Sequence, residues 1–156
     1  MNTIHIFKKS ILFFVTDIDT ISSENITQNY GGNVMSINLN QADKKQTLNL
    51  KKLNVISKLH DNWNGYGAEP LQKKLIALTA DLIRKLYIQP EIFPTADGTI
   101  QLEFEKDNGD YLEFQFSGKG LCDVFRLRGD NEEYFKARDD SFSINHLVED
   151  FYGFSF

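Results

Sequence analysis

The sequence predicts an α+β protein in which an antiparallel β-meander of three to five strands packs against two or three helices. Two observations carry this prediction: apolar residues recur with helical spacing between residues 47 and 90, and they alternate with polar residues after residue 91. The length of 156 residues indicates one domain with a genuine core. Its predicted parts are N-terminal strands and a polar loop (1–46), a helix-loop-helix (47–90), an antiparallel sheet (91–138) and a C-terminal helix (141–153).

The first 46 residues are predicted to contain little regular structure beyond an N-terminal strand. Residues 4–15 are rich in β-branched and aromatic residues and read as one or two strands. Residues 16–46 are polar and predict a loop, with a candidate short strand at Val34–Leu39. The run Ile11–Val15 follows two lysines, but it is shorter than the roughly 7–15 apolar residues of a signal peptide. No apolar run reaches the roughly 20 residues of a membrane helix, so we expect a cytoplasmic protein.

Two helices are predicted in the next segment, at about 48–60 and about 70–87. Pro70 suits the first turn of the second helix, and Pro90 ends it. Lysines on both helices could form a nucleic-acid face, but a solvated surface is the more typical reading in an acidic chain. The apolar stripes are Leu50, Leu53, Ile56 and Leu59 in the first helix, and Leu71, Leu75, Leu78, Leu82 and Leu86 in the second.

The sheet begins with strands around 100–105 and 111–116, joined at the turn signal Asn108-Gly109. Their apolar faces coincide only if paired residue numbers sum to an even value. That favours a three-residue loop at 108–110, which pairs Phe104 with Phe114 and Leu102 with Phe116. On the opposite face, Glu105 would then lie opposite Glu113, and Glu103 opposite Gln115.

Two more strands and a helix complete the prediction. Leu121–Arg128 reads as a third strand and Glu133–Ala137 as a fourth. The C-terminal helix has apolar residues at helical spacing from Ile144 to Phe151, and it ends at Gly153.

The charge distribution favours a basic partner. The formal net charge is −5, and residues 91–156 contain 15 acidic against 6 basic residues, whereas residues 1–90 contain 7 against 11. An acidic chain is not attracted to nucleic acid or to anionic membranes, so both are disfavoured as partners. The single cysteine, Cys122, indicates a reducing compartment. Nothing in the sequence indicates an oligomeric state.

Two motifs, W-N-G-Y-G-A-E-P at 63–70 and P-T-A-D-G-T-I-Q-L-E-F at 94–104, resemble those of a widespread family of small bacterial proteins. That family carries a W-[DN]-G-Y-G-A-x-P loop and a P-T-x-D-G-x-[IV]-Q-L-E-[WF] hairpin entry, and the match covers roughly residues 50–116. The resemblance implies a bacterial origin and a shared fold core. It implies no reaction and transfers no catalytic residue.

The candidate binding residues are the polar face of the hairpin and the aromatic residues of the first motif: Glu103, Glu105, Glu113, Gln115, Trp63 and Tyr66. Opposed carboxylates are destabilising unless they are compensated. Arg126, Arg128 or solvent could supply the compensation, a basic protein surface is the sharper alternative, and a divalent metal has too few clear oxygen ligands.

We expect a non-enzymatic protein-binding module that resembles an antitoxin or an immunity protein in its action and uses no cofactor. No catalytic triad and no metal-ligand spacing is readable in the sequence. The alternative is a small hydrolase-like enzyme. Its site would combine Asp61, Asn62, Trp63 and Tyr66 with the hairpin carboxylates.

Overall fold

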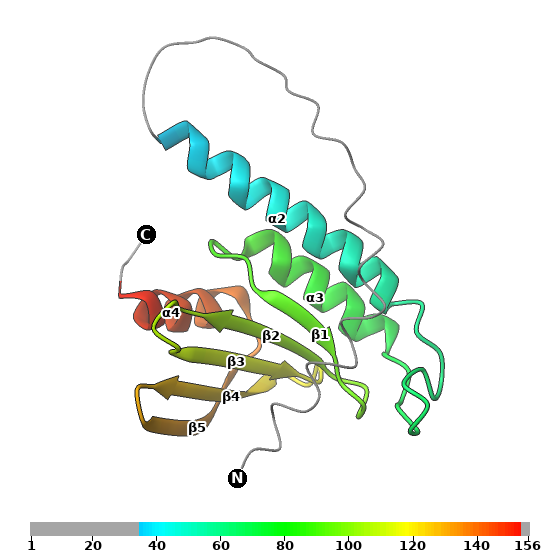
Figure 1. Ribbon diagram of the computed structural model, residues 1–156. Helices are drawn as coiled ribbons and strands as arrows, with labels where there is room; N and C mark the ends of the chain where they lie inside the picture. The colour runs from blue at the N-terminus through cyan, green and yellow to red at the C-terminus, as the bar shows by residue number, and fades with distance from the viewer. Residues whose placement is uncertain (1–34, 154–156) are drawn as a thin grey trace.

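The protein is a five-stranded antiparallel meander with helices on one side of the sheet (Figure 1). The computed structural model describes residues 35–153, and it describes side chains from residue 43 onward. The predicted strand at 4–15 lies outside this range. The strands follow one another in space as in sequence, β1-β2-β3-β4-β5. In chain order the elements are α2 (Met35–Ile56), α3 (Lys73–Lys85), β1 (Glu91–Pro94), β2 (Ile100–Glu105), β3 (Tyr111–Phe116), β4 (Leu121–Arg128), β5 (Asn131–Arg138) and α4 (Ser141–Tyr152).

Helix α2 starts earlier and ends earlier than the sequence predicts. The short strand expected at Val34–Leu39 is wrong from Met35 onward, since that stretch belongs to the helix. From residue 39 onward the chain is rich in Leu, Gln, Ala and Lys, which favour helices, and it contains no glycine or proline before the helix ends. Polar contacts then hold the helix to the segment just before β1: the Asn49 amide donates to the Gln89 side chain at 3.2 Å and to the Pro90 carbonyl at 3.0 Å.

Helix α3 is shorter at both ends than the predicted 70–87. Pro70 lies outside it because the preceding residue, Glu69, donates its backbone N–H to the Ala96 carbonyl at 2.9 Å, which keeps this stretch in a loop. At the other end Leu86 already has an extended backbone. The predicted stripe is confirmed at the buried residues Leu75, Leu82 and Leu86, whereas Leu78 is 39% exposed and Thr79 and Ile83 are buried in addition.

The hairpin register differs from the prediction by two residues. Phe104 pairs with Leu112, and Leu102 pairs with Phe114. The reason is the turn: Gly109 adopts φ +86 and donates to the Lys106 carbonyl at 2.9 Å, so the three-residue loop is 107–109 instead of 108–110. The shift is even, so both apolar faces still coincide.

The core lies between the sheet and the helices. Its central row of paired residues crosses β1 to β4 and is almost fully buried: Ile92, Leu102, Phe114 and Val124. Helix α4 matches the predicted 141–153 closely. Asp140 caps its start by accepting from the Ser143 N–H at 2.9 Å, and Gly153 ends it with φ +78.

Asn145 of α4 joins the end of α3 to the start of α4. Its amide donates to the Lys85 carbonyl at 2.9 Å and its carbonyl oxygen accepts from the Tyr87 N–H at 3.1 Å. Asn145 is itself buried, so these bonds satisfy backbone groups that water reaches poorly.

We expect Asn145→Ala to lower the free energy of unfolding by about 2 kcal/mol, because it removes two hydrogen bonds from a buried side chain to part-buried backbone groups. The neighbouring His146→Ala, at an exposed position, is the matched control and should stay within about 0.5 kcal/mol of wild type. Urea unfolding followed by circular dichroism measures both. Equal losses in the two variants would contradict this role of Asn145.

Candidate functional site

The sheet face that points away from α3 and α4 carries the predicted binding carboxylates, and we call it the outer face. One row of directly paired residues crosses all five strands on this face. It begins with three glutamates and ends with two aromatic residues, in the order Glu91, Glu103, Glu113, Phe125 and Tyr134. Glu103 therefore lies opposite Glu113, and not opposite Gln115 as predicted, while Glu105 pairs with Tyr111.

Lysines of α2 compensate the first glutamate of the row. Lys45 and Lys52 approach the Glu91 carboxylate at 2.9 and 3.8 Å. The Lys52 ammonium also lies 4.4 Å from the centre of the Phe93 ring. Burial lowers the pKa of Lys52, and the nearby charges of Glu91 and Glu103 oppose that shift. The amine thus reaches the outer face from the edge of the sheet.

The other two glutamates are held by neutral donors. The Gln101 amide donates to Glu103 at 2.9 Å, and the Tyr111 hydroxyl donates to Glu113 at 3.0 Å. Burial and the two carboxylates raise the pKa of Tyr111, so its hydroxyl remains a donor at neutral pH. Glu103 is only 9% exposed, which makes it a supporting residue of the outer face more than a contact surface.

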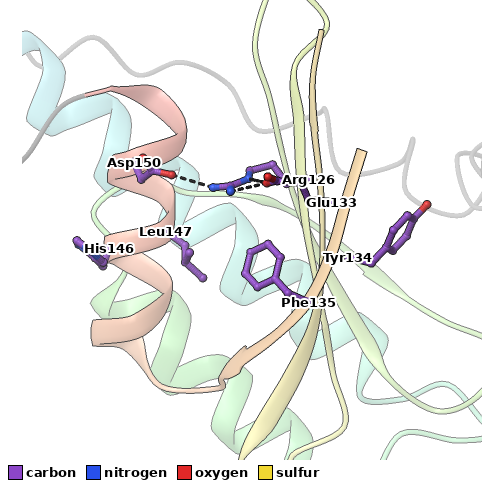
Figure 2. Close-up of a pocket in the computed structure, with 7 residues that line it drawn as sticks. All are labelled: Arg126, Glu133, Tyr134, Phe135, His146, Leu147 and Asp150. Carbon is purple, nitrogen blue, oxygen red and sulfur yellow. Dashed lines mark hydrogen bonds and ion pairs between the residues drawn. The ribbon is translucent and has the colours of Figure 1, made fainter. Parts of the chain in front are cut away.

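Arg126 and Arg128 do not compensate these glutamates, contrary to one of the predicted alternatives. Both arginines point to the helix side of the sheet. Arg126 Nε donates to Glu133 at 2.6 Å, and the Arg126 guanidinium binds the Asp150 carboxylate of α4 at 2.8 Å (Figure 2). The Arg128 guanidinium binds the same carboxylate at 2.9 Å. This placement can be predicted from the sequence, because side chains alternate along a strand. Arg126 and Arg128 have even numbers, as do the buried residues Cys122 and Val124 of the same strand.

An aromatic row lies beside the glutamates on the outer face. Ring centroids are 6.1 Å apart for Tyr111 and Phe125, and 4.7 Å apart for Phe125 and Tyr134. Tyr134 is 68% exposed. This row was not predicted from the sequence, although Tyr111 and Glu113 are two residues apart in β3 and therefore lie on the same face.

Exposed acidic residues gather at one end of the outer face. The turns after β2 and β4 lie together there, because the Gly129 N–H donates to the Asp110 carboxylate at 2.9 Å. That bond and one to the Asn108 side chain lower the pKa of Asp110. The remaining acids of this end are exposed, and we call them the acidic end: Glu105, Asp107, Asp130 and Glu132.

The Trp/Gly loop, residues 61–70, is held together by side chains that mimic backbone turns. Asn62 has φ +59, and its side chain accepts from the Gly67 N–H at 2.7 Å. The Asn64 side chain accepts from the Tyr66 and Ala68 N–H groups at 2.8 and 3.1 Å. The loop presents Tyr66 to solvent, with 93% of the residue exposed.

The two motifs that carry the family resemblance contact each other. The loop binds the β1–β2 turn through the Glu69 N–H and the Ala96 carbonyl. In that turn Asp97 accepts from Gln115 of β3 at 3.1 Å, which links the turn to the outer face. Gly98 packs against Glu69: a Cβ at this position would lie 3.3 Å from the Glu69 Cβ.

The six predicted binding residues therefore occupy three places. Glu103 and Glu113 lie side by side in the centre of the outer face. Gln115 contacts the β1–β2 turn, on which the loop with Trp63 and Tyr66 rests; the Trp63 indole N–H donates to the Glu69 carbonyl at 3.3 Å. Glu105 lies at the opposite end of β2, in the acidic end.

Two cavities in the described part of the chain lie away from these residues. One is a groove of about 620 Å³ between α4 and β5, which we call the edge groove (Figure 2). The other, of about 500 Å³, lies between the end of α3 and the start of α4. The edge groove is lined by Arg126, Glu133, Tyr134 and Phe135 of the sheet and by His146, Leu147 and Asp150 of α4, although the ring of Tyr134 points away from α4 (Figure 2).

No further chemistry is evident among the described residues. Burial raises the pKa of the Cys122 thiol to about 12, so it is not a nucleophile at neutral pH. Residues 35–153 contain no group of three or more His, Cys, Asp or Glu side chains arranged to hold a metal ion. In the same range no helix has the length and apolar character needed to cross a membrane. No family model, curated protein or solved structure matches this chain.

We expect Gly98→Ala to destabilise the protein by about 1 kcal/mol more than Gly109→Ala. Both glycines have positive φ, but an added Cβ meets Glu69 and the Pro70 carbonyl only at Gly98, whereas the space at Gly109 is open. Urea unfolding midpoints of the two variants test this difference. Identical midpoints would show that the contact between loop and turn is not tight.

Proposed function

We propose that this protein is a non-enzymatic module that binds a basic protein partner through its outer face. The observation that carries the proposal is the aromatic row Tyr111, Phe125 and Tyr134 lying directly beside the glutamates of the same face. Tyrosine and other aromatic residues are enriched at the centres of protein interfaces, where a few of them supply most of the binding energy.

The charges of the outer face favour a basic partner over an acidic one. After residue 91 the chain has few cations, and most of them are already paired: Arg126 and Arg128 with Asp150, Lys136 with Asp123, and Arg138 with Asp140. The exposed carboxylates of the acidic end add negative potential next to the aromatic row. Complementary charge speeds association and rejects partners of the wrong sign.

A bacterial antitoxin or immunity protein would use such a surface to neutralise its partner. These roles need a stable complex and no catalytic group, which agrees with the absence of a readable catalytic set in the sequence. We place this role in the cytoplasm, because the chain has one cysteine and it is buried as a thiol.

The enzyme alternative receives less support. It requires a pocket that combines the Trp/Gly loop with the hairpin carboxylates, but neither the edge groove nor the cavity between α3 and α4 is lined by these residues. The side chains of Asn62 and Asn64 are engaged in loop hydrogen bonds. A nucleic-acid face is weakened as well, because Lys52 is half-buried and bound to Glu91.

The test is co-purification of the tagged full chain from cells that encode it, at low and at moderate salt, followed by affinity measurement with the partner found. We expect Glu105→Lys plus Asp107→Lys to weaken binding about tenfold or more, mainly through slower association. Both positions are exposed, so the fold should tolerate the change.

The matched control is Asp43→Lys plus Asp81→Lys, which makes the same change in net charge on the exposed surfaces of α2 and α3. It should bind like wild type. A partner that is equally sensitive to both pairs responds only to net charge. A partner insensitive to the first pair does not use the acidic end, and either result contradicts the proposal.

A further inference from the structure

Strand β5 is an edge of the sheet, and its exposed side chains follow a simple order. The even-numbered residues from Glu132 to Arg138 are exposed on the outer face, whereas Glu133, Phe135 and Ala137 are half-buried on the helix side. Within the described residues β5 pairs only with β4.

The turn between β4 and β5 decides which backbone groups face the free edge. It contains two residues, with Gly129 at φ +57, so Arg128 and Asn131 form the hydrogen-bonded pair that closes the hairpin. The odd-numbered residues of β5 therefore direct their N–H and C=O groups toward β4. The same pattern continues just beyond the strand, where the N–H of the odd-numbered Asp139 donates to the Gly120 carbonyl. The N–H and C=O groups of the even-numbered residues lie in the plane of the sheet and point away from β4, toward the free edge.

The exposed charges of β5 are complementary to those of the β5 strand of a second copy that runs antiparallel to it. If Tyr134 lies opposite Tyr134 of a second copy, Glu132 lies opposite Lys136 and Asp130 lies opposite Arg138, in each direction. Within one copy Lys136 and Arg138 pair with Asp123 and Asp140, so in the dimer each would share its charge between its own carboxylate and that of the second copy. Even numbers meet even numbers, so the Tyr134 pair and the pairs of Glu132 with Lys136 join residues whose backbone groups point outward, whereas Asp130 belongs to the turn before β5. A shift by two residues either way removes both kinds of pair and leaves a single new one, Asp130 with Lys136 or Glu132 with Arg138. Charged residues usually discourage pairing at an edge, but this order selects the chain's own copy in one register.

The side chains on both faces of β5 fit the same arrangement. On the outer face, the ring of Tyr134 extends the aromatic row to the edge, where the row of the second copy would continue it. On the helix side, Phe135 and Leu147 point into the edge groove, and Tyr134 points away from it (Figure 2). In this register Phe135 of one copy lies diagonal to Phe135 of the other, within reach of an aromatic ring.

We propose that two copies of this chain associate through antiparallel β5–β5 pairing centred on Tyr134. The product is a two-fold symmetric dimer with one continuous sheet of ten strands, five from each copy. The helices of both copies lie on one side of this sheet, and the two outer faces form a single surface on the other. This inference concerns the edge of the sheet, and it stands whether or not the outer face binds a basic partner.

Sedimentation equilibrium of the purified full chain tests the dimer directly. We expect a mass of twice 18.0 kDa at high concentration that falls toward 18.0 kDa on dilution. Glu132→Lys brings two lysines opposite each other across the joint, and Lys136→Glu brings two glutamates opposite each other, so each variant alone should dimerise about tenfold more weakly. The Glu105→Lys variant is the matched control: it lies in the same row of paired residues on β2, and it should dimerise like wild type.

Mixing the two variants gives the decisive result. In the mixed dimer the two β5 lysines of the Glu132→Lys variant face the two β5 glutamates of the Lys136→Glu variant, so the equimolar mixture should recover the wild-type affinity. A wild-type protein that stays monomeric at its highest soluble concentration overturns the proposal. So does a dimer that both single variants leave intact, or a mixture that fails to recover.

Amide hydrogen exchange on the wild-type protein provides a second measurement that depends on no variant. At high concentration the amides of Glu132, Tyr134 and Lys136 should be protected, and this protection should vanish on dilution. The amides of Glu133 and Phe135, which bond to β4, should be protected at both concentrations. Fast exchange of the even-numbered amides at every concentration would overturn β5–β5 pairing even if a dimer forms through another surface.

Discussion

The structure depends on one constraint: one face of the sheet is buried under helices, and this burial determines which residues lie on the opposite, outer face. Strand side chains alternate, so each strand places every second residue in the core and the remainder on the outer face. The pairing register then aligns the core rows across the strands, and Ile92, Leu102 and Phe114 lie side by side with no exposed surface. A slip of one residue would exchange the two faces, and this cost fixes the position of every outer-face residue.

The same constraint explains why the outer face is acidic. Arg126 and Arg128 fall on the helix side, where the carboxylates of Glu133 and Asp150 neutralise them. The cations that could have balanced Glu103 and Glu113 are thus used to join α4 to the sheet. Buried or half-buried arginines of this kind contribute geometry more than stability, because the cost of removing their charge from water offsets the ion pairs.

Sequence reasoning recovers what local patterns determine. The strands from β2 to β4 and the C-terminal helix follow from period and from turn residues such as Gly109 and Gly153. The exact register depends on which residue of the turn takes the left-handed conformation, and Asn108-Gly109 permits more than one choice, so the prediction erred by two residues. The start of α2 was missed for a different reason: between Leu39 and Leu48 only Ala42 is apolar, so no apolar periodicity marks the helix there, although the composition favours it. The candidate site was likewise predictable only in part. Alternation along each strand predicts which face of the sheet a residue occupies, whereas the contact between the Trp/Gly loop and the β1–β2 turn at Ala96 joins segments that are distant in sequence.

The two proposals are coupled through the position of Tyr134. It belongs both to the aromatic row of the outer face and to the centre of the β5 edge, so a partner that binds this row lies close to the dimer joint. Each copy carries a net charge of −5, and bringing two copies together concentrates negative charge on one continuous surface. A basic partner that spans the joint relieves this repulsion. Because coupling free energies are reciprocal, such a partner tightens the dimer by the same factor by which dimerisation tightens the partner.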